Sequence, residues 1–331
     1  MAPTGYFHLV LSGSGIKTMT SGALGVRGNF TLGGTASAEA AGAITVGGNV
    51  VIDNGSAFNG SSYTHNVAGN WTNNGGTYTA STGTINLNGS GLQTLGGTYS
   101  TTFNNLTLNN SSGAALGNNI TIGGTLTFSN GKITTGADTL SLGSSATVSG
   151  AGVGKYIYGK LLRYIPVGSP TMNFVIGDAT NYAPVTVNFN GVSKTGTLLG
   201  TTTGTEHPEI TGSGVNALKS VNRYWSLTST STEYTDYSAI FTFVAEDVDP
   251  GANTNDFLIK RWNGSSWNSA TTGTRTSTTT QITGATSFGD FADGEACVSS
   301  EDPVSASATE TLICSGGNSV LSLSGGGGGT N

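Results

Sequence analysis

The sequence predicts an all-β protein: a parallel β-solenoid (β-helix) over residues 1–150, followed by an antiparallel β-sandwich over residues 151–295. Two observations predict this order. A short pattern of alternating apolar residues recurs about every 20 residues in the first half, and the composition changes abruptly near residue 150. No segment has the sustained 3.6-residue apolar period of an amphipathic helix.

The repeat of the first half joins a glycine corner to a short stretch of alternating apolar residues. Copies are centred on residues 28, 48, 69, 104, 124 and 144, and the 35-residue step is interpreted as containing one degenerate copy. Alternation with period two predicts short strands, and stacking them roughly 4.8 Å apart buries their apolar faces. We expect one inward stack, with one residue from each copy: Phe30, Val50, Trp71, Leu106, Leu126 and Ala146.

Proline and charge mark the two halves differently. None of the seven prolines lies within residues 4–165, as expected where each coil donates backbone N–H groups to its neighbours. Only three of the 12 basic and three of the 18 acidic residues lie in residues 1–150, which leaves nine and 15 beyond. There, turn dipeptides such as Asn190-Gly191 separate strand-like runs and predict a sandwich. The expected strands are 173–176, 184–189, 223–227, 239–244 and 257–262.

The composition also limits the partners. The 331 residues include 53 glycines and carry a net charge of −6, without clusters of Lys and Arg. Because binding to a phosphate backbone requires such clusters, we expect no nucleic-acid partner. No apolar run reaches the roughly 18 residues of a membrane span, so we expect none in this segment. Residues 1–20 lack the features of a secretion signal, which indicates a processed chain or an internal segment.

Three stretches resemble the large adhesin-like surface proteins that Bacteroidetes and related bacteria export through the type IX system. Residues 123–143 are similar to their solenoid repeats, and residues 220–228, 241–267 and 286–295 to the sandwich that often follows. Residues 307–326 look like the opening of their tandem immunoglobulin-like modules. The resemblance implies a linker and truncated immunoglobulin-like segment over residues 296–331. It also implies an extracellular location at the bacterial cell surface, with glycans or neighbouring surface proteins as partners.

The carboxylates of the first half argue against an enzyme. They are only Glu39, Asp53 and Asp138. Asp53 and Asp138 are about four coils, or roughly 20 Å, apart, whereas glycosidase pairs need about 5–9.5 Å. Glu39 and Asp53 fall within one coil, but no histidine or lysine lies near Glu39 in the sequence. We therefore expect a non-enzymatic chain, and a β-helix polysaccharide-degrading enzyme is the third interpretation.

The outward positions of the repeat predict a ladder of small polar side chains. A flat, regular ladder of this kind binds glycans or ice, although threonine is also what any solvent-facing strand prefers. Two hypotheses follow: a structural or adhesive segment of a long exported surface protein, and a carbohydrate- or ice-binding module. The candidate ligand-binding residues are Asn29, Thr31, Asn70, Thr72, Asn105, Thr107, Thr125 and Thr127.

Residues 246–256 alternate oxygen-bearing side chains around a glycine. This pattern is typical of short loops that surround Ca²⁺ with oxygen ligands. The segment lacks the closing glutamate of an EF-hand. A turn whose Asx side chains cap their own backbone has the same sequence pattern. The candidate calcium ligands are Asp247, Asp249, Asn253, Asn255 and Asp256.

Two further clusters are present in the second half. Residues 206–209 (EHPE) group titratable side chains beside a proline, which predicts an exposed loop. Trp262 and Trp267 lie beside Lys260 and Arg261 and either stack on a sugar or, as their alternation favours, contribute to the sandwich core.

Overall fold

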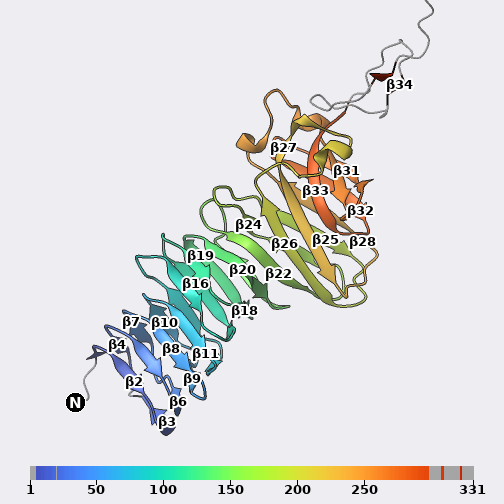
Figure 1. Cartoon of the computed structure of the whole chain (residues 1–331). Helices are drawn as coiled ribbons and strands as arrows, with labels where there is room; N and C mark the ends of the chain where they lie inside the picture. The colour runs from blue at the N-terminus through green and yellow to red at the C-terminus, as the bar shows by residue number, and fades with distance from the viewer. Residues whose placement is uncertain (1–4, 20, 298–306, 309–320, 323–331) are drawn as a thin grey trace, which may run out of the picture.

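A computed structural model describes residues 5–19, 21–297, 307–308 and 321–322. Short strands stack into a rod that leads into a broader two-layer region (Figure 1). The helices of the described residues are three 3-10 turns, η1 (Ile210–Gly212), η2 (Ala245–Asp247) and η3 (Thr254–Asp256). None of the helices in this part of the chain is long and apolar enough to cross a membrane.

The rod is a parallel β-solenoid, as predicted, and the structure shows that it has three sides. Its first side, here called face A, is an eight-stranded parallel sheet. The strands of face A are β1 (Gly5–Tyr6), β4 (Leu24–Val26), β7 (Ile44–Val46), β10 (Thr64–Val67), β13 (Thr84–Leu87), β16 (Asn105–Asn109), β19 (Thr125–Asn130) and β21 (Thr147–Ser149).

The second and third sides, faces B and C, complete each coil. Face B contains β2 (Leu9–Leu11), β5 (Phe30–Leu32), β8 (Val50–Asp53), β11 (Trp71–Asn74), β14 (Gln93–Gly96), β17 (Ala114–Leu116) and β20 (Ile133–Leu142). Face C contains β3 (Ser14–Thr18), β6 (Thr35–Glu39), β9 (Ala57–Asn59) and β12 (Thr77–Thr79). In later coils β15 (Thr101–Phe103) and β18 (Ile120–Ile122) pair with each other, and β18 joins β20.

The expectation of one inward stack is wrong. Phe30, Val50 and Trp71 are in register on face B, where the next residue of the stack is Leu95. Leu106 and Leu126 are in register on face A, between Ile85 and Val148. All six expected residues are buried, but the 35-residue step moves the later copies to another side of the coil. Both corners use the same glycine-containing pattern, so the pattern alone does not distinguish the sides.

The sandwich continues the solenoid without a break. Strand β22 (Ile157–Ile165) pairs in parallel with β20 and antiparallel with β26 (Gly196–Thr203), so face B and one sandwich layer form a single sheet. Strand β24 (Ile176–Gly177) pairs with β22. That layer goes on through β27 (Val215–Thr230), β33 (Gly289–Ala296), β29 (Leu258–Trp262) and β30 (Trp267–Ser269).

A second, five-stranded antiparallel sheet packs on this layer, an arrangement that fits the predicted sandwich. Trp225 of the first layer contacts Phe241 of the second, which also packs on Phe291. One hydrophobic core extends from the solenoid into the sandwich. The strands of the second sheet are β23 (Thr171–Phe174), β25 (Val185–Asn190), β28 (Asp236–Thr242), β32 (Thr279–Ala285) and β31 (Thr271–Arg275).

The five strands expected in the second half are present, within a few residues or as part of a longer strand, and six more were missed. The missed strands are β22, β26, β30, β31, β32 and β33, several of which are rich in glycine or contain acidic residues, types that are rare in strands. The predicted immunoglobulin-like segment lies almost wholly outside the described residues. Within it only residues 296–297 and the short pair β34 (Ser307–Ala308) and β35 (Leu321–Ser322) are described.

Candidate functional site

The outward surface of face A is a regular array of small polar side chains, here called the polar face. Pairing between strands aligns two columns along the solenoid axis, with neighbouring members about 4.8 Å apart. Among the described residues, the face A strands from β7 to β21 have no charged side chain at the positions of these two columns. One column contains Thr45, Asn66, Asn86, Thr107, Thr127 and Ser149, and the other Thr64, Thr84, Asn105, Thr125 and Thr147.

Hydroxyl and amide groups contact one another along these columns. The Thr125 and Thr147 hydroxyls are 3.1 Å apart, and Asn86 Nδ2 donates to Asn66 Oδ1 at 2.7 Å. Side chains linked in this way lose rotational freedom before a ligand arrives, which lowers the entropic cost of binding. The polar face is therefore an ordered, uncharged surface that offers donors, acceptors and threonine methyl groups.

The eight candidate ligand-binding residues do not form the single column that was expected. Asn105, Thr107, Thr125 and Thr127 lie on the polar face, whereas Thr31 and Thr72 lie on face B. The cause is the same change of side that divides the core stack. The missed members of the polar face, such as Thr64 and Asn66 or Thr84 and Asn86, were recognisable as Thr-x-Asn in successive coils.

The other two candidates, Asn29 and Asn70, belong to a structural ladder together with Asn49. Asn29 Oδ1 accepts the N–H of Asn49 at 2.9 Å, and Asn49 Oδ1 accepts the N–H of Asn70 at 2.8 Å. Asn70 Oδ1 accepts the N–H of Thr94 at 2.8 Å, and His8 Nδ1 occupies the equivalent place in the first coil. Each side chain accepts a hydrogen bond from a backbone N–H group of the next coil. At this corner strand pairing provides no acceptor for that N–H group.

This ladder explains the Gly-Asn pairs of the repeat. A Cβ on Gly48 would lie 2.4 Å from Asn29 Oδ1, and a Cβ on Gly69 would lie 2.5 Å from Asn49 Oδ1. A third case is Gly124, whose Cβ would lie 2.6 Å from Asn105 Oδ1, the acceptor for the N–H of Thr125. Glycine is therefore required where the asparagine of the previous coil crosses beneath the chain.

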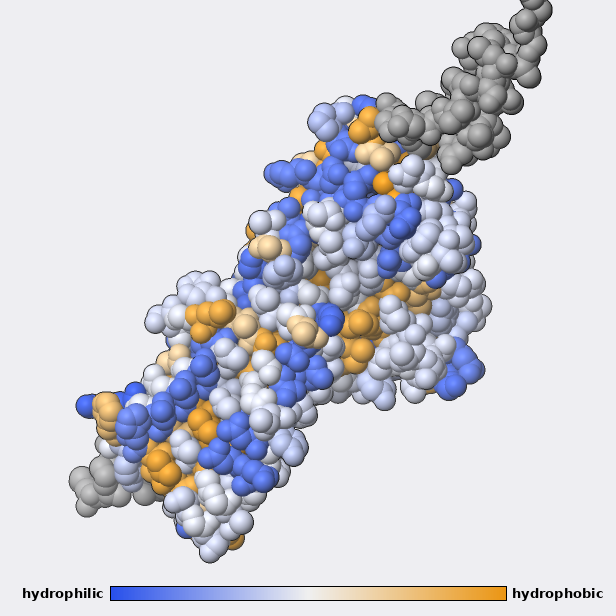
Figure 2. Space-filling view, viewed as in Figure 1, coloured by the Kyte–Doolittle hydropathy of each residue, from blue (hydrophilic) through white to orange (hydrophobic). Residues whose placement is uncertain are grey.

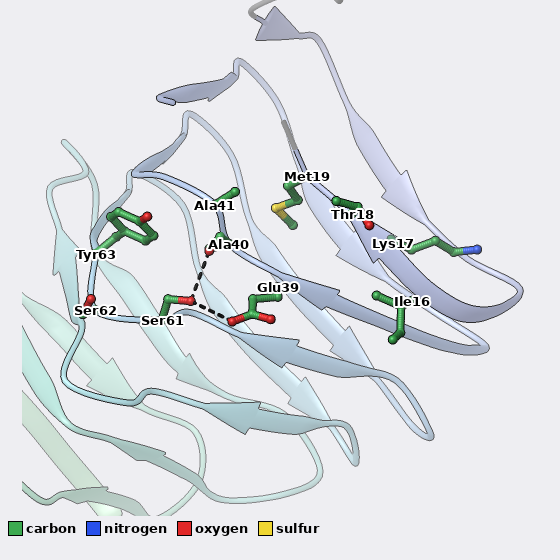
Figure 3. A pocket seen from close by; sticks show the side chains of 10 residues that line it. All are labelled: Ile16, Lys17, Thr18, Met19, Glu39, Ala40, Ala41, Ser61, Ser62 and Tyr63. Carbon is green, nitrogen blue, oxygen red and sulfur yellow. Dashed lines mark hydrogen bonds between the residues drawn. The ribbon is translucent and has the colours of Figure 1, made fainter. Parts of the chain in front are cut away.

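The acidic side chains of the solenoid are separated. Glu39 lines a pocket of about 430 Å³ on face C, where its carboxylate accepts from Ser61 (Figure 3). It also accepts from Asn59. Asp53 accepts from Asn74 and lies near Gly33, at the other end of β6. The length of β6 alone separates them by roughly 13 Å, beyond the spacing of glycosidase pairs.

The candidate calcium ligands point to different partners. Asp247 pairs with Arg223, and Asp249 accepts from Ser220 and Asn222. Asn253, Asn255 and Asp256 bond to one another in the turn around η3, which is the Asx-capped alternative. Within residues 5–19 and 21–297, no three acidic, histidine or cysteine side chains are placed to hold a metal ion.

The remaining clusters come together around His207. Its ring lies 4.8 Å from Trp267, 6.0 Å from Trp262 and 4.9 Å from Tyr224. The His207 side chain is only 4% exposed, so the expectation of an exposed loop is wrong at this residue. Trp267 packs on a small cluster outside the sandwich core, and its Nε1 donates to Glu209 O at 2.6 Å.

Space-filling representation shows the general character of the surface on the side viewed. Most of it is hydrophilic or intermediate, and the hydrophobic residues form small separate groups (Figure 2).

No protein-family model, curated protein or solved structure matches this chain. Its function is consequently inferred from the geometry of its own residues.

Proposed function

We propose that this chain is a non-enzymatic, structural and adhesive segment of an exported bacterial cell-surface protein. The solenoid acts as a stalk and as a multivalent contact surface, and the sandwich extends it. The observation that carries the proposal is the polar face, which repeats the same uncharged groups over successive coils.

Multivalency makes such a surface adhesive without any strong single site. Once one coil contacts an extended partner, the next coil is held close to the next contact, and weak affinities combine through effective concentration. A glycan chain or a repetitive surface protein is suited to this face because neither requires charge pairing. The resemblance to type IX surface proteins supports an extracellular location.

The mechanical part of the proposal is supported by the shared sheet. Strand β22 pairs with the last long strand of the solenoid on one edge and with the sandwich on the other. A force applied to either region is therefore carried by backbone hydrogen bonds and a common core, and no flexible linker intervenes.

Ice binding is the second candidate, favoured by the regular spacing of threonine hydroxyl and methyl groups on the polar face. Bulky side chains placed on that face test whether it is the contact surface, and freezing-point hysteresis distinguishes ice binding from adhesion. The double variant Thr107→Tyr, Thr127→Tyr is compared with Thr31→Tyr, Thr72→Tyr, which makes the same changes on face B.

Attachment of protein-coated beads to immobilised glycans and bacterial surfaces should fall at least tenfold for the face A variant only. Freezing-point hysteresis of the unaltered chain should be absent if adhesion is the function and present if ice is the ligand. Equal attachment by both variants, or release of reducing ends from polysaccharide that disappears in Glu39→Gln, would refute the adhesive proposal.

A further inference from the structure

A second concave site lies where the solenoid meets the sandwich, away from the polar face. This junction pocket has a volume of about 350 Å³, at the small end of the range typical of small-molecule sites, about 300–1,000 Å³. It lies between β22, the turn after β24, the end of β26 and η2. The residues that define its chemistry are Tyr158, Asp178, Asn181, Thr203, Gly204 and Asp247.

The floor of the junction pocket is a buried ion network. Arg223 is fully buried; its Nη2 donates to Asp178 at 2.6 Å and its Nε to Asp247 at 2.8 Å. Its Nη1 donates to Thr202 Oγ1 at 3.2 Å. Two carboxylates around one guanidinium leave the site with a net negative charge, which disfavours anionic ligands. The guanidinium occupies the space between the carboxylates and disfavours a metal ion there.

Gly204 gives a ligand access to this network. A Cβ at this position would lie 2.4 Å from Asp178 Oδ2 and 3.4 Å from Arg223 Nη2. The backbone of Gly204 is not in the left-handed region that favours glycine, so its conformation does not demand this residue. The missing side chain is what leaves the carboxylate open to the pocket.

The acceptor and the rim are both held in place. Asp178 Oδ1 accepts from the N–H groups of Thr180 and Asn181, at 2.7 and 2.8 Å. Burial opposes ionisation of Asp178, but these bonds and Arg223 lower its pKa to about 2, so the carboxylate is a permanent acceptor at neutral pH. Tyr158, 37% exposed, supplies an aromatic ring at the rim.

We propose that the junction pocket binds one ring of a neutral sugar. The apolar face of a pyranose packs on Tyr158, and neighbouring hydroxyls donate to Asp178 and exchange hydrogen bonds with Asn181 and Thr203. A pyranose fits because it combines an apolar face with several donors and carries no charge. This site goes beyond the adhesive polar face and would give the protein a terminal-sugar specificity that a repetitive surface lacks.

The test uses the full chain and four methyl glycosides, those of glucose, galactose, mannose and xylose. Binding is measured by saturation-transfer NMR and calorimetry, and methyl glucuronide is compared with methyl glucoside as a charged counterpart. At least one neutral glycoside should bind saturably in the millimolar range or tighter. The glucuronide should bind at least tenfold more weakly than its neutral counterpart.

The decisive variant is Tyr158→Ala, and its matched control is Tyr164→Ala. Tyr164 lies on the same strand, is 47% exposed and does not line the pocket. Tyr158→Ala should weaken binding at least tenfold with an unchanged melting temperature, and Tyr164→Ala should bind normally. Gly204→Ala should abolish binding. If this variant does not fold, the comparison of Tyr158→Ala with Tyr164→Ala still tests the proposal.

Saturable binding by none of the four glycosides, or equal affinity in the two tyrosine variants, overturns the proposal. Neither result affects the adhesive function, because bead attachment through the polar face does not involve Tyr158. Conversely, Thr107→Tyr, Thr127→Tyr should bind the glycosides normally.

Discussion

Arg223 donates to both carboxylate oxygens of Asp247, at 2.8 and 3.1 Å, although the two side chains are 0% and 8% exposed. They come from β27 and η2, which lie on either side of β28 in the sequence. The pair joins the first sandwich layer to the loop that was predicted to hold calcium. Asp178, from the turn after β24, binds the same guanidinium.

Removal of Asp247 should be costly, because it leaves the fully buried guanidinium of Arg223 with Asp178 as its remaining carboxylate partner. We expect Asp247→Ala to lower the free energy of unfolding by about 3–5 kcal/mol. The double variant Arg223→Met, Asp247→Leu should be less destabilised than Asp247→Ala, because it removes the fully buried guanidinium together with Asp247, and the partly exposed Asp178 keeps its bonds from the N–H groups of Thr180 and Asn181. Urea denaturation of the three proteins measures this, and a double variant less stable than the single one would contradict it.

The ladder of Asn29, Asn49 and Asn70 predicts a sharp difference between glycines. Gly48→Ala should destabilise the solenoid by about 1–3 kcal/mol, because the new Cβ collides with Asn29 Oδ1 and with the backbone of Gly28. Gly91→Ala is the control, since no atom lies within 4 Å of its Cβ position and its backbone conformation does not require glycine. Equal melting temperatures for the two variants would show that the corner tolerates a side chain.

The inward and outward positions of β11 should differ in their tolerance of a charged side chain. Trp71 is 1% exposed and packs on Tyr78 and Phe103, whereas the next residue, Thr72, points outward. Trp71→Asp should unfold the region, because the loss of packing and the burial of a charge exceed the usual 0.5–3 kcal/mol of point substitutions. Thr72→Asp should be mild. Circular dichroism of both variants tests the assignment, which fails if both are tolerated.

Asp293 makes stability depend on pH. Its carboxylate is fully buried, and neither oxygen has a hydrogen-bond partner among the described residues. Burial raises its pKa to about 7. Between about pH 4 and pH 7 the folded chain therefore keeps a proton that the unfolded chain has lost, and this residue's contribution to stability falls as pH rises.

Asp293→Asn should remove this contribution. The variant should gain stability relative to the unaltered chain as pH rises from 4 to 7, by up to about 4 kcal/mol, and the difference should be constant above pH 8. Denaturation of both proteins across this range gives the difference directly. A difference that does not change with pH would show that Asp293 is ionised in the folded state.

The sequence by itself determined the local features of this protein. Alternation with period two predicted the strands, the 20-residue spacing predicted coils, and the shortage of proline and charge before residue 150 predicted where the parallel stack lies. These features can be read along the chain without knowing which strands pair. The same is true of the turn at Asn190-Gly191, where Gly191 adopts a positive φ directly after β25.

The tertiary structure decided what depends on accumulated length and on distant pairing. The side of the coil that a repeat occupies depends on the accumulated length of all the preceding strands and corners. Trp71 and Leu106 are therefore alike in pattern but lie on different faces. Whether an asparagine binds a ligand or the next coil depends on the backbone stacked above it. Arg223 meets Asp178 from 45 residues away only because β22, β26 and β27 pair in that order. Local alternation carries no information about such pairings, because every strand presents the same two faces.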